Sequence, residues 1–159
     1  CQTAFPYAQL RELRRRMDAF PRPLDLRMVV YDELFDTCAA DTDLLPSLEL
    51  ADTVTYWTWR AKNIDKLPEN FARLRRIVPG KRILLGVYLW DFGDKKEMPR
   101  NLMERQLAIG LDLWYKGEAE GFVFLCSSIC NRPFPAVECA REWLSRHADD
   151  CRFGNGKRK

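Results

Sequence analysis

The chain has 159 residues, of which 47% are hydrophobic and 31% charged, enough for one domain with a hydrophobic core and unlike a disordered chain. The net charge of +3 is too small to indicate a nucleic-acid-binding surface. No apolar run approaches the ~20 residues that a membrane-spanning helix needs. The chain begins at Cys1 rather than at a methionine, which is typical of a processed or trimmed chain, and no cellular location is predicted.

The first part of the chain predicts a helix, a strand and a short helix. Apolar residues recur at helical spacing over residues 7–20, and Pro21-Arg22-Pro23 ends this helix. The apolar run 24–31 predicts a strand that continues directly into the acidic stretch 32–36. We expect a loop over 37–43 and a short helix over 44–50 with Pro46 in its first turn.

The remaining chain alternates strands and helices. Strands are predicted over 53–59, 82–90 and 122–127, with a turn-like loop over 91–94. Helices are predicted over 62–78, with Pro68 near the start, over 101–116, capped by Gly117, and over 135–147. We assign residues 1–150 to a single β/α domain and 151–159 to a flexible basic tail.

A helix between every pair of strands predicts parallel strands joined by right-handed crossovers, and therefore an α/β fold. Two architectures fit: a small open parallel sheet, or half of an eight-stranded (β/α)8 TIM barrel with four strands and four to five helices. An open nucleotide-binding sheet usually carries a glycine-rich turn, and neither GxGxxG nor GxxxxGK(S/T) occurs in the chain. The half barrel is therefore favoured, and no cofactor is expected.

The alternation of side chains along each strand predicts which of them face the barrel interior. On the third strand Ile83, Leu85, Val87 and Leu89 are expected to pack on helices. The residues predicted to point inward are Val29, Tyr31 and Glu33, then Thr53, Thr55, Trp57 and Trp59, then Gly86, Tyr88 and Trp90. The fourth strand is ambiguous, because Phe122, Phe124 and Cys126 alternate with Val123 and Leu125.

Acidic, aromatic and hydroxyl side chains gather at the predicted carboxyl ends of the strands, where βα barrels build their sites. Glycoside hydrolysis needs two carboxyl groups that face each other across the sugar, and Glu33 and Asp91 are the candidate catalytic pair. The candidate substrate-binding residues are Tyr31, Asp32, Trp57, Trp59, Tyr88, Trp90 and Ser127. Sugar rings pack their C–H faces on aromatic rings, and hydroxyl and carboxylate groups bind sugar hydroxyls.

Structural alternatives remain open for these residues. Asp91 is also placed to cap the turn at Phe92-Gly93, and Glu33 to pair with an arginine such as Arg60. The aromatic rings would equally fill a barrel core. The six cysteines include no Cys-x-x-Cys pair and His147 is the single histidine, so no metal site is predicted.

Four segments, 48–61 (LELADTVTYWTWRA), 79–94 (PGKRILLGVYLWDFGD), 98–106 and 120–143, resemble the C-terminal half of an uncharacterised bacterial family of glycoside-hydrolase-like TIM-barrel proteins. The resemblance covers most of the chain from about Leu26 onward, and its WTW and GVYLWDFG stretches are the most specific part. It implies a (β/α)8 barrel with carbohydrate as the ligand. In a full barrel, strands 1 to 4 would precede Cys1 and would carry any catalytic carboxylate missing here.

Three functions are therefore compatible with the sequence. The first is a glycoside-hydrolase-like enzyme that acts through Glu33 and Asp91. The second is a non-catalytic carbohydrate-binding barrel, in which Trp59 is needed for binding and Glu33 is not. The third is a barrel fragment without activity of its own, whose open edges invite self-association or pairing with a missing N-terminal half.

Overall fold

The computed structural model describes residues 6–37, 44–125 and 127–150. In chain order its elements, with η for a 3-10 helix, are α1 (Tyr7–Asp18), β1 (Arg27–Tyr31), α2 (Asp32–Thr37), α3 (Leu45–Glu49), β2 (Thr53–Trp57), η2 (Ala61–Lys66), α4 (Leu67–Ile77), β3 (Arg82–Tyr88), β4 (Trp90–Asp91), β5 (Lys96–Glu97), α5 (Arg100–Tyr115), β6 (Gly121–Leu125), η3 (Ser127–Ile129) and α6 (Pro135–His147). The predicted basic tail, Cys126 and most of the predicted loop 37–43 lie outside the described residues.

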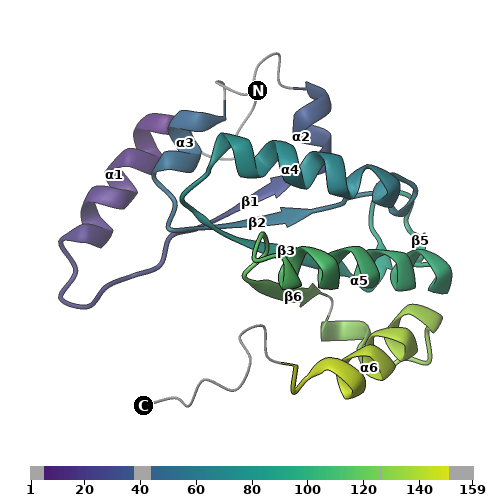
Figure 1. Ribbon diagram of the computed structural model, residues 1–159. Coiled ribbons are helices and arrows are strands. Elements are labelled where there is room, and N and C mark those ends of the chain that lie inside the picture. Colours follow the sequence, from purple (N-terminus) through teal and green to yellow (C-terminus); the bar gives the residue numbers. More distant parts are fainter. Residues whose placement is uncertain (1–5, 38–43, 126, 151–159) are drawn as a thin grey trace.

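The main sheet has four parallel strands in the order β1-β2-β3-β6, which confirms the α/β class and the parallel arrangement. Each strand therefore lies beside the next long strand of the sequence, and the strand order never reverses. Right-handed crossovers that all step in the same direction place their helices on the same face of the sheet. Figure 1 shows α4 alongside β1 and β2, and α1 and α3 beside the amino-terminal ends of these strands.

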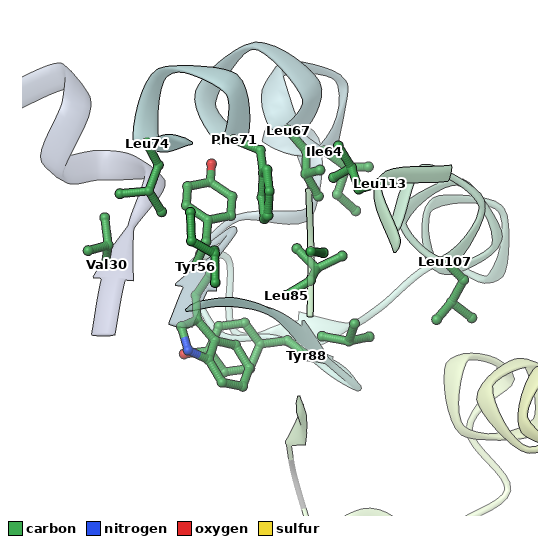
Figure 2. Close-up of a cluster of buried hydrophobic side chains, with 14 of the residues drawn as sticks. Val30, Tyr56, Ile64, Leu67, Phe71, Leu74, Leu85, Tyr88, Leu107 and Leu113 are labelled. Carbon is green, nitrogen blue, oxygen red and sulfur yellow. The ribbon is translucent and has the colours of Figure 1, made fainter. Parts of the chain in front are cut away.

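The helices cover the sheet face that the strand alternation predicted. On β2, Tyr56 is fully buried, and its ring lies 5.9 Å from Phe71 of α4 and 6.2 Å from Phe35 of α2. Ile83, Leu85 and Val87 on β3 are also fully buried on this face. Figure 2 shows Tyr56, Phe71 and Leu74 grouped on the α4 side of the strands, with Tyr88 on the opposite side. Burial of this continuous apolar layer is the main stabilising contribution to the fold.

The structure resolves the ambiguous fourth strand. β6 pairs Leu85 with Phe122 and Val87 with Phe124, so both phenylalanines lie on the helix-covered face. There Trp143 of α6 packs against them, with ring centroids 5.0 Å from Phe122 and 6.0 Å from Phe124. Val123 and Leu125 consequently lie on the opposite face, beside Gly86 and Tyr88.

The other face of the sheet carries Val29, Gly86 and Leu125. Among the described residues, the ring contacts of α2, α4 and α6 with the strands lie on the first face. The two outer strands of the other face leave large apolar side chains exposed: Val29 of β1 is 48% exposed and Leu125 of β6 is 43% exposed. Near the amino-terminal ends of the strands the face is polar, because Asp25 accepts hydrogen bonds from Thr53 and Arg82. The exposed apolar side chains therefore lie on the two outer strands, whereas Trp57 and Tyr88 on the inner strands of this face are buried.

Several element predictions were wrong in detail, and the second and fourth strands end at Trp57 and Leu125, two residues earlier than predicted. The stretch after β1 is helix α2 rather than a continuation of the strand, which raises the described α-helices to six. The predicted helix 62–78 is divided into η2 and α4, with Pro68 in the first turn of α4. The third strand ends at Tyr88, and Trp90–Asp91 instead pairs antiparallel with Lys96–Glu97 in a small hairpin.

The predicted end of the long helix at Gly117 is confirmed. Gly117 has a φ of 76°, in the left-handed region that glycine adopts without a Cβ clash. Its N–H donates to the carbonyl of Trp114, and the N–H of Glu118 donates to the carbonyl of Leu113. This pair of bonds is the Schellman arrangement, which satisfies carbonyls left unpaired at the end of α5.

Candidate functional site

Five aromatic side chains meet at the carboxyl ends of β1, β2 and β3, and we call them the aromatic rim: Tyr31, Trp57, Trp59, Tyr88 and Phe92. Trp59 is central, with its ring 5.4 Å from Tyr31, 5.9 Å from Tyr88 and 5.9 Å from Phe92. The sequence predicted four of these residues as ligand-binding, and the structure brings all four together. Phe92, in the turn after β4, was not predicted, although it lies two residues from Trp90 in the same aromatic stretch.

The aromatic rim has a buried layer and a partly exposed layer. Trp57 is only 5% exposed and Tyr88 only 3% exposed, and their rings lie 4.5 Å apart. Trp59 and Phe92 are half-buried and lie nearly parallel, with 23° between their ring planes. The first pair is therefore part of the interior, whereas the second pair keeps part of its ring surface in contact with solvent.

The indole of Trp57 lies over Gly86 of the neighbouring strand. A Cβ added at Gly86 would fall 2.0 Å from the indole Cδ2, so only glycine permits this ring position. Tyr88 follows on the same face, where its hydroxyl donates to the hydroxyl of Tyr31 at 3.4 Å. Burial is the main reason that the pKa of Tyr88 is raised above its usual range, so this tyrosine stays neutral.

A charged group, the Arg60 network, borders the aromatic rim. Arg60 donates to Glu33 Oε1 at 3.2 Å, to Asp94 Oδ1 at 2.6 Å and to the carbonyl of Gly93 at 3.0 Å. The Arg60 guanidinium lowers the pKa of Asp94, and Asp94, followed by Glu33, raises the pKa of Arg60. The pairing of Glu33 with Arg60, one of the two alternatives for Glu33, is confirmed.

Asp32 holds Trp59 in place rather than facing a ligand. Its side chain is 2% exposed and accepts two hydrogen bonds at 2.8 Å, from the backbone N–H of Trp59 and from Nδ2 of Asn63. At 2% exposure this carboxylate has almost no surface to offer a sugar hydroxyl. Its two hydrogen bonds give Asp32 a positioning role between α2 and the end of β2.

The candidate catalytic carboxyl groups lie in different surroundings. Glu33 belongs to the first turn of α2, so the inward alternation predicted for β1 does not extend to it. Its side chain is 45% exposed and is held by Arg60. Asp91 is 1% exposed, and its Oδ1 accepts the backbone N–H of Asp94 at 3.1 Å. The turn-capping alternative for Asp91 is thus confirmed, and Arg60 and Asp94 stand between the two carboxyl groups.

Two further predicted residues are separate from the aromatic rim. The ring of Trp90 packs against Phe134, with 5.8 Å between ring centroids, because the chain leaves β3 after Tyr88 and enters the β4–β5 hairpin. Ser127 lies beyond the end of β6, in η3, and its carbonyl accepts the N–H of Cys130. Both predictions assumed longer strands than the chain forms.

Comparison with protein-family models, with curated proteins and with solved structures gives no match. Within residues 6–37, 44–125 and 127–150, no group of three or more acidic, cysteine or histidine side chains is arranged to hold a metal ion. A search of the same residues finds no helix with the length and hydropathy needed to span a membrane.

Proposed function

We propose that the chain is half of an eight-stranded (β/α)8 barrel. The support is the combination of four parallel strands in sequence order with helix contacts on one face and exposed apolar side chains on the other. Open doubly wound sheets reverse their strand order and carry helices on both faces. When each new strand is added on the same side of the one before it, all crossover helices lie on one face of the sheet. The other face then has no helix layer, and in a (β/α)8 barrel it becomes the barrel interior.

We further propose that the aromatic rim binds carbohydrate at the carboxyl ends of these strands. The observation that carries this proposal is the half-buried, nearly parallel pair Trp59 and Phe92, bordered by the Arg60 network. Such a ring surface suits the C–H face of a sugar, and its rigidity limits the entropy lost on binding. The guanidinium and carboxylate groups of the network suit the hydroxyl groups at the edge of the sugar.

These residues favour binding over hydrolysis. A hydrolase needs two carboxyl groups about 5 to 9.5 Å apart across the scissile bond. Glu33 is engaged by Arg60, and Asp91 is buried and caps a turn. A catalytic pair would therefore need a carboxyl group from the rest of the barrel.

Titration calorimetry with a panel of soluble oligosaccharides tests the binding proposal. We expect Trp59→Ala to weaken binding about tenfold or more, because one stacking surface is lost. Trp90→Ala is the matched control, since this tryptophan lies against Phe134 outside the rim, and we expect nearly wild-type affinity. Glu33→Gln should also retain binding, because the glutamine keeps a carbonyl oxygen that can accept a sugar hydroxyl. Equal affinities of the Trp59→Ala variant and the wild type, or no bound sugar at all, would refute the proposal.

A further inference from the structure

The uncovered face of the sheet ends at two open edge strands. Among the described strands, β1 and β6 each pair with one neighbour only, β2 and β3 respectively. Neither edge contains the proline or interior charge that commonly protects an exposed strand edge. Each edge strand also carries one exposed large apolar side chain, Val29 on β1 and Leu125 on β6. Both edges are therefore suited to pair with another strand.

We propose that a second copy of this chain covers this face and closes an eight-stranded barrel, with β1 of each copy beside β6 of the other. Two copies supply the eight strands of a βα barrel. A two-fold axis along the barrel axis keeps all strands parallel and makes the two seams identical. The inference rests on the half-barrel arrangement proposed above and is independent of whether the aromatic rim binds sugar.

The register of the strands brings the two exposed side chains together. A path from Val29 across the sheet runs through Thr55 and Leu84 to Gly121. In a barrel of shear number 8, the strands tilt, so a path drawn at right angles to them returns to its first strand eight residues closer to the amino terminus. After half the circumference, the path has therefore moved about four residues toward the amino terminus. Gly121 then lies beside Asp25 of the second copy, and Leu125 lies beside its Val29. The side chains left most exposed on the two edges thus become partners in each seam.

The exposed part of this face lies along its two edges. At its centre Thr55, Trp57 and Tyr88 are already buried, whereas Val29 on β1 and Leu125 on β6 are 48% and 43% exposed. The surface that needs an occupant is therefore the pair of edges, which a second copy would meet with its own two edges. Joining two copies would cover both faces and all four open edges, and the flanking helices would add to the contact area.

Sedimentation velocity on the purified chain tests the proposal, and we expect a mass of twice the 18.7 kDa of one copy. Val29→Asp would place a carboxylate in each seam, and we expect the dimer to weaken on the order of a hundredfold. Val29 is 48% exposed in one copy, so the aspartate should leave the fold intact, as circular dichroism can verify. Leu13→Asp is the matched control, because Leu13 is 43% exposed on α1, and we expect an unchanged dimer.

A cysteine pair tests the register directly. We expect the double variant Val29→Cys/Leu125→Cys to form a covalent dimer on mild oxidation, with the disulfide between these two positions identified by mass spectrometry. The two single variants contain the same native cysteines and should not form this bond. A monomer at about 100 μM, a dimer unaffected by Val29→Asp, or a double variant that crosslinks no more than the single variants would each overturn the proposal.

Discussion

At the level of single residues, the site depends on the contact between Trp57 and Gly86. The indole occupies the space that any side chain at position 86 would need. Tyr88 rests on Trp57 with 4.5 Å between ring centroids, and Phe92 lies 4.8 Å from Tyr88. A displacement of Trp57 would therefore be transmitted through the buried layer of the aromatic rim to the half-buried ring of Phe92.

Gly86→Ala should destabilise the fold by about 1 to 3 kcal/mol, because the new Cβ overlaps a buried ring that cannot move freely. Urea unfolding measures the effect, and near-ultraviolet circular dichroism reports the altered packing of the indole. Gly80→Ala is the matched control, because a Cβ there meets no atom within 4 Å. Equal stabilities of the two variants would show that the Trp57 position is not constrained by Gly86.

At the level of elements, two aspartates, Asp32 and Asp52, connect helices to the ends of strands. Asp32 joins the start of α2 to the residues that follow β2, and Asp52 joins α1 to the start of the sheet. Asp52 Oδ2 accepts the N–H of Leu26 at 2.8 Å and a hydrogen bond from Arg14 at 2.6 Å. The bond from Leu26, followed by the bond from Arg14, lowers the pKa of Asp52 below its ordinary value of 3.8.

This lowered pKa predicts a defined pH dependence. A carboxyl group with a lower pKa in the folded state adds stability that is complete above its unfolded pKa of about 4 and is lost as the pH falls toward the folded pKa. Asp52→Asn should therefore lower the free energy of unfolding at pH 7 by about 1 kcal/mol, a modest effect because the side chain is 44% exposed.

The difference between the Asp52→Asn variant and the wild type should shrink between pH 5 and about pH 3, as the wild-type carboxyl becomes protonated. Urea unfolding at a series of pH values measures it. Asp112→Asn, which removes an exposed ion pair with Lys116, is the charge-matched control and should change stability by less than about 0.5 kcal/mol at pH 7. A difference for Asp52→Asn that is as large at pH 3 as at pH 7 would contradict this account.

At the level of the whole molecule, the one-sided arrangement of helices has a thermodynamic consequence. If a second copy covers the bare face, folding and association are linked, and the melting temperature depends on protein concentration. We expect the melting temperature to rise by several degrees between about 1 and 100 μM. Differential scanning fluorimetry or calorimetry across this range measures the shift.

The Val29→Asp variant should lose this concentration dependence while Leu13→Asp keeps it, because only Val29 lies on the open face. A melting temperature that is constant over the range for the wild type would mean that the chain is stable without a second copy. The sugar-binding measurement is separate from this result, since Trp59 follows β2, an inner strand of the sheet, and does not belong to either edge strand.

Much of the architecture was predictable because it depends on local periodicity. Strand geometry alone places Tyr56 and Trp57 on opposite faces of the sheet. Helical spacing alone predicts the apolar stripe of α4. The parallel order of the strands follows from the intervening helices. The exact ends of elements were less predictable, because Trp59 and Trp90 continue the apolar pattern beyond the points at which pairing stops.

The amino-acid sequence by itself determined the α/β class, the parallel strand order, and the gathering of Tyr31, Trp57, Trp59 and Tyr88 at one end of the sheet. Tertiary structure alone decided that Asp32 and Asp91 are buried structural groups, that Glu33 pairs with Arg60, and that Phe92 joins the rim while Trp90 leaves it. The physical reason is that periodicity reports which face a side chain occupies within its own element. The partner of a carboxylate or a ring depends on where separate elements end and meet, and that information is spread over residues distant in the chain.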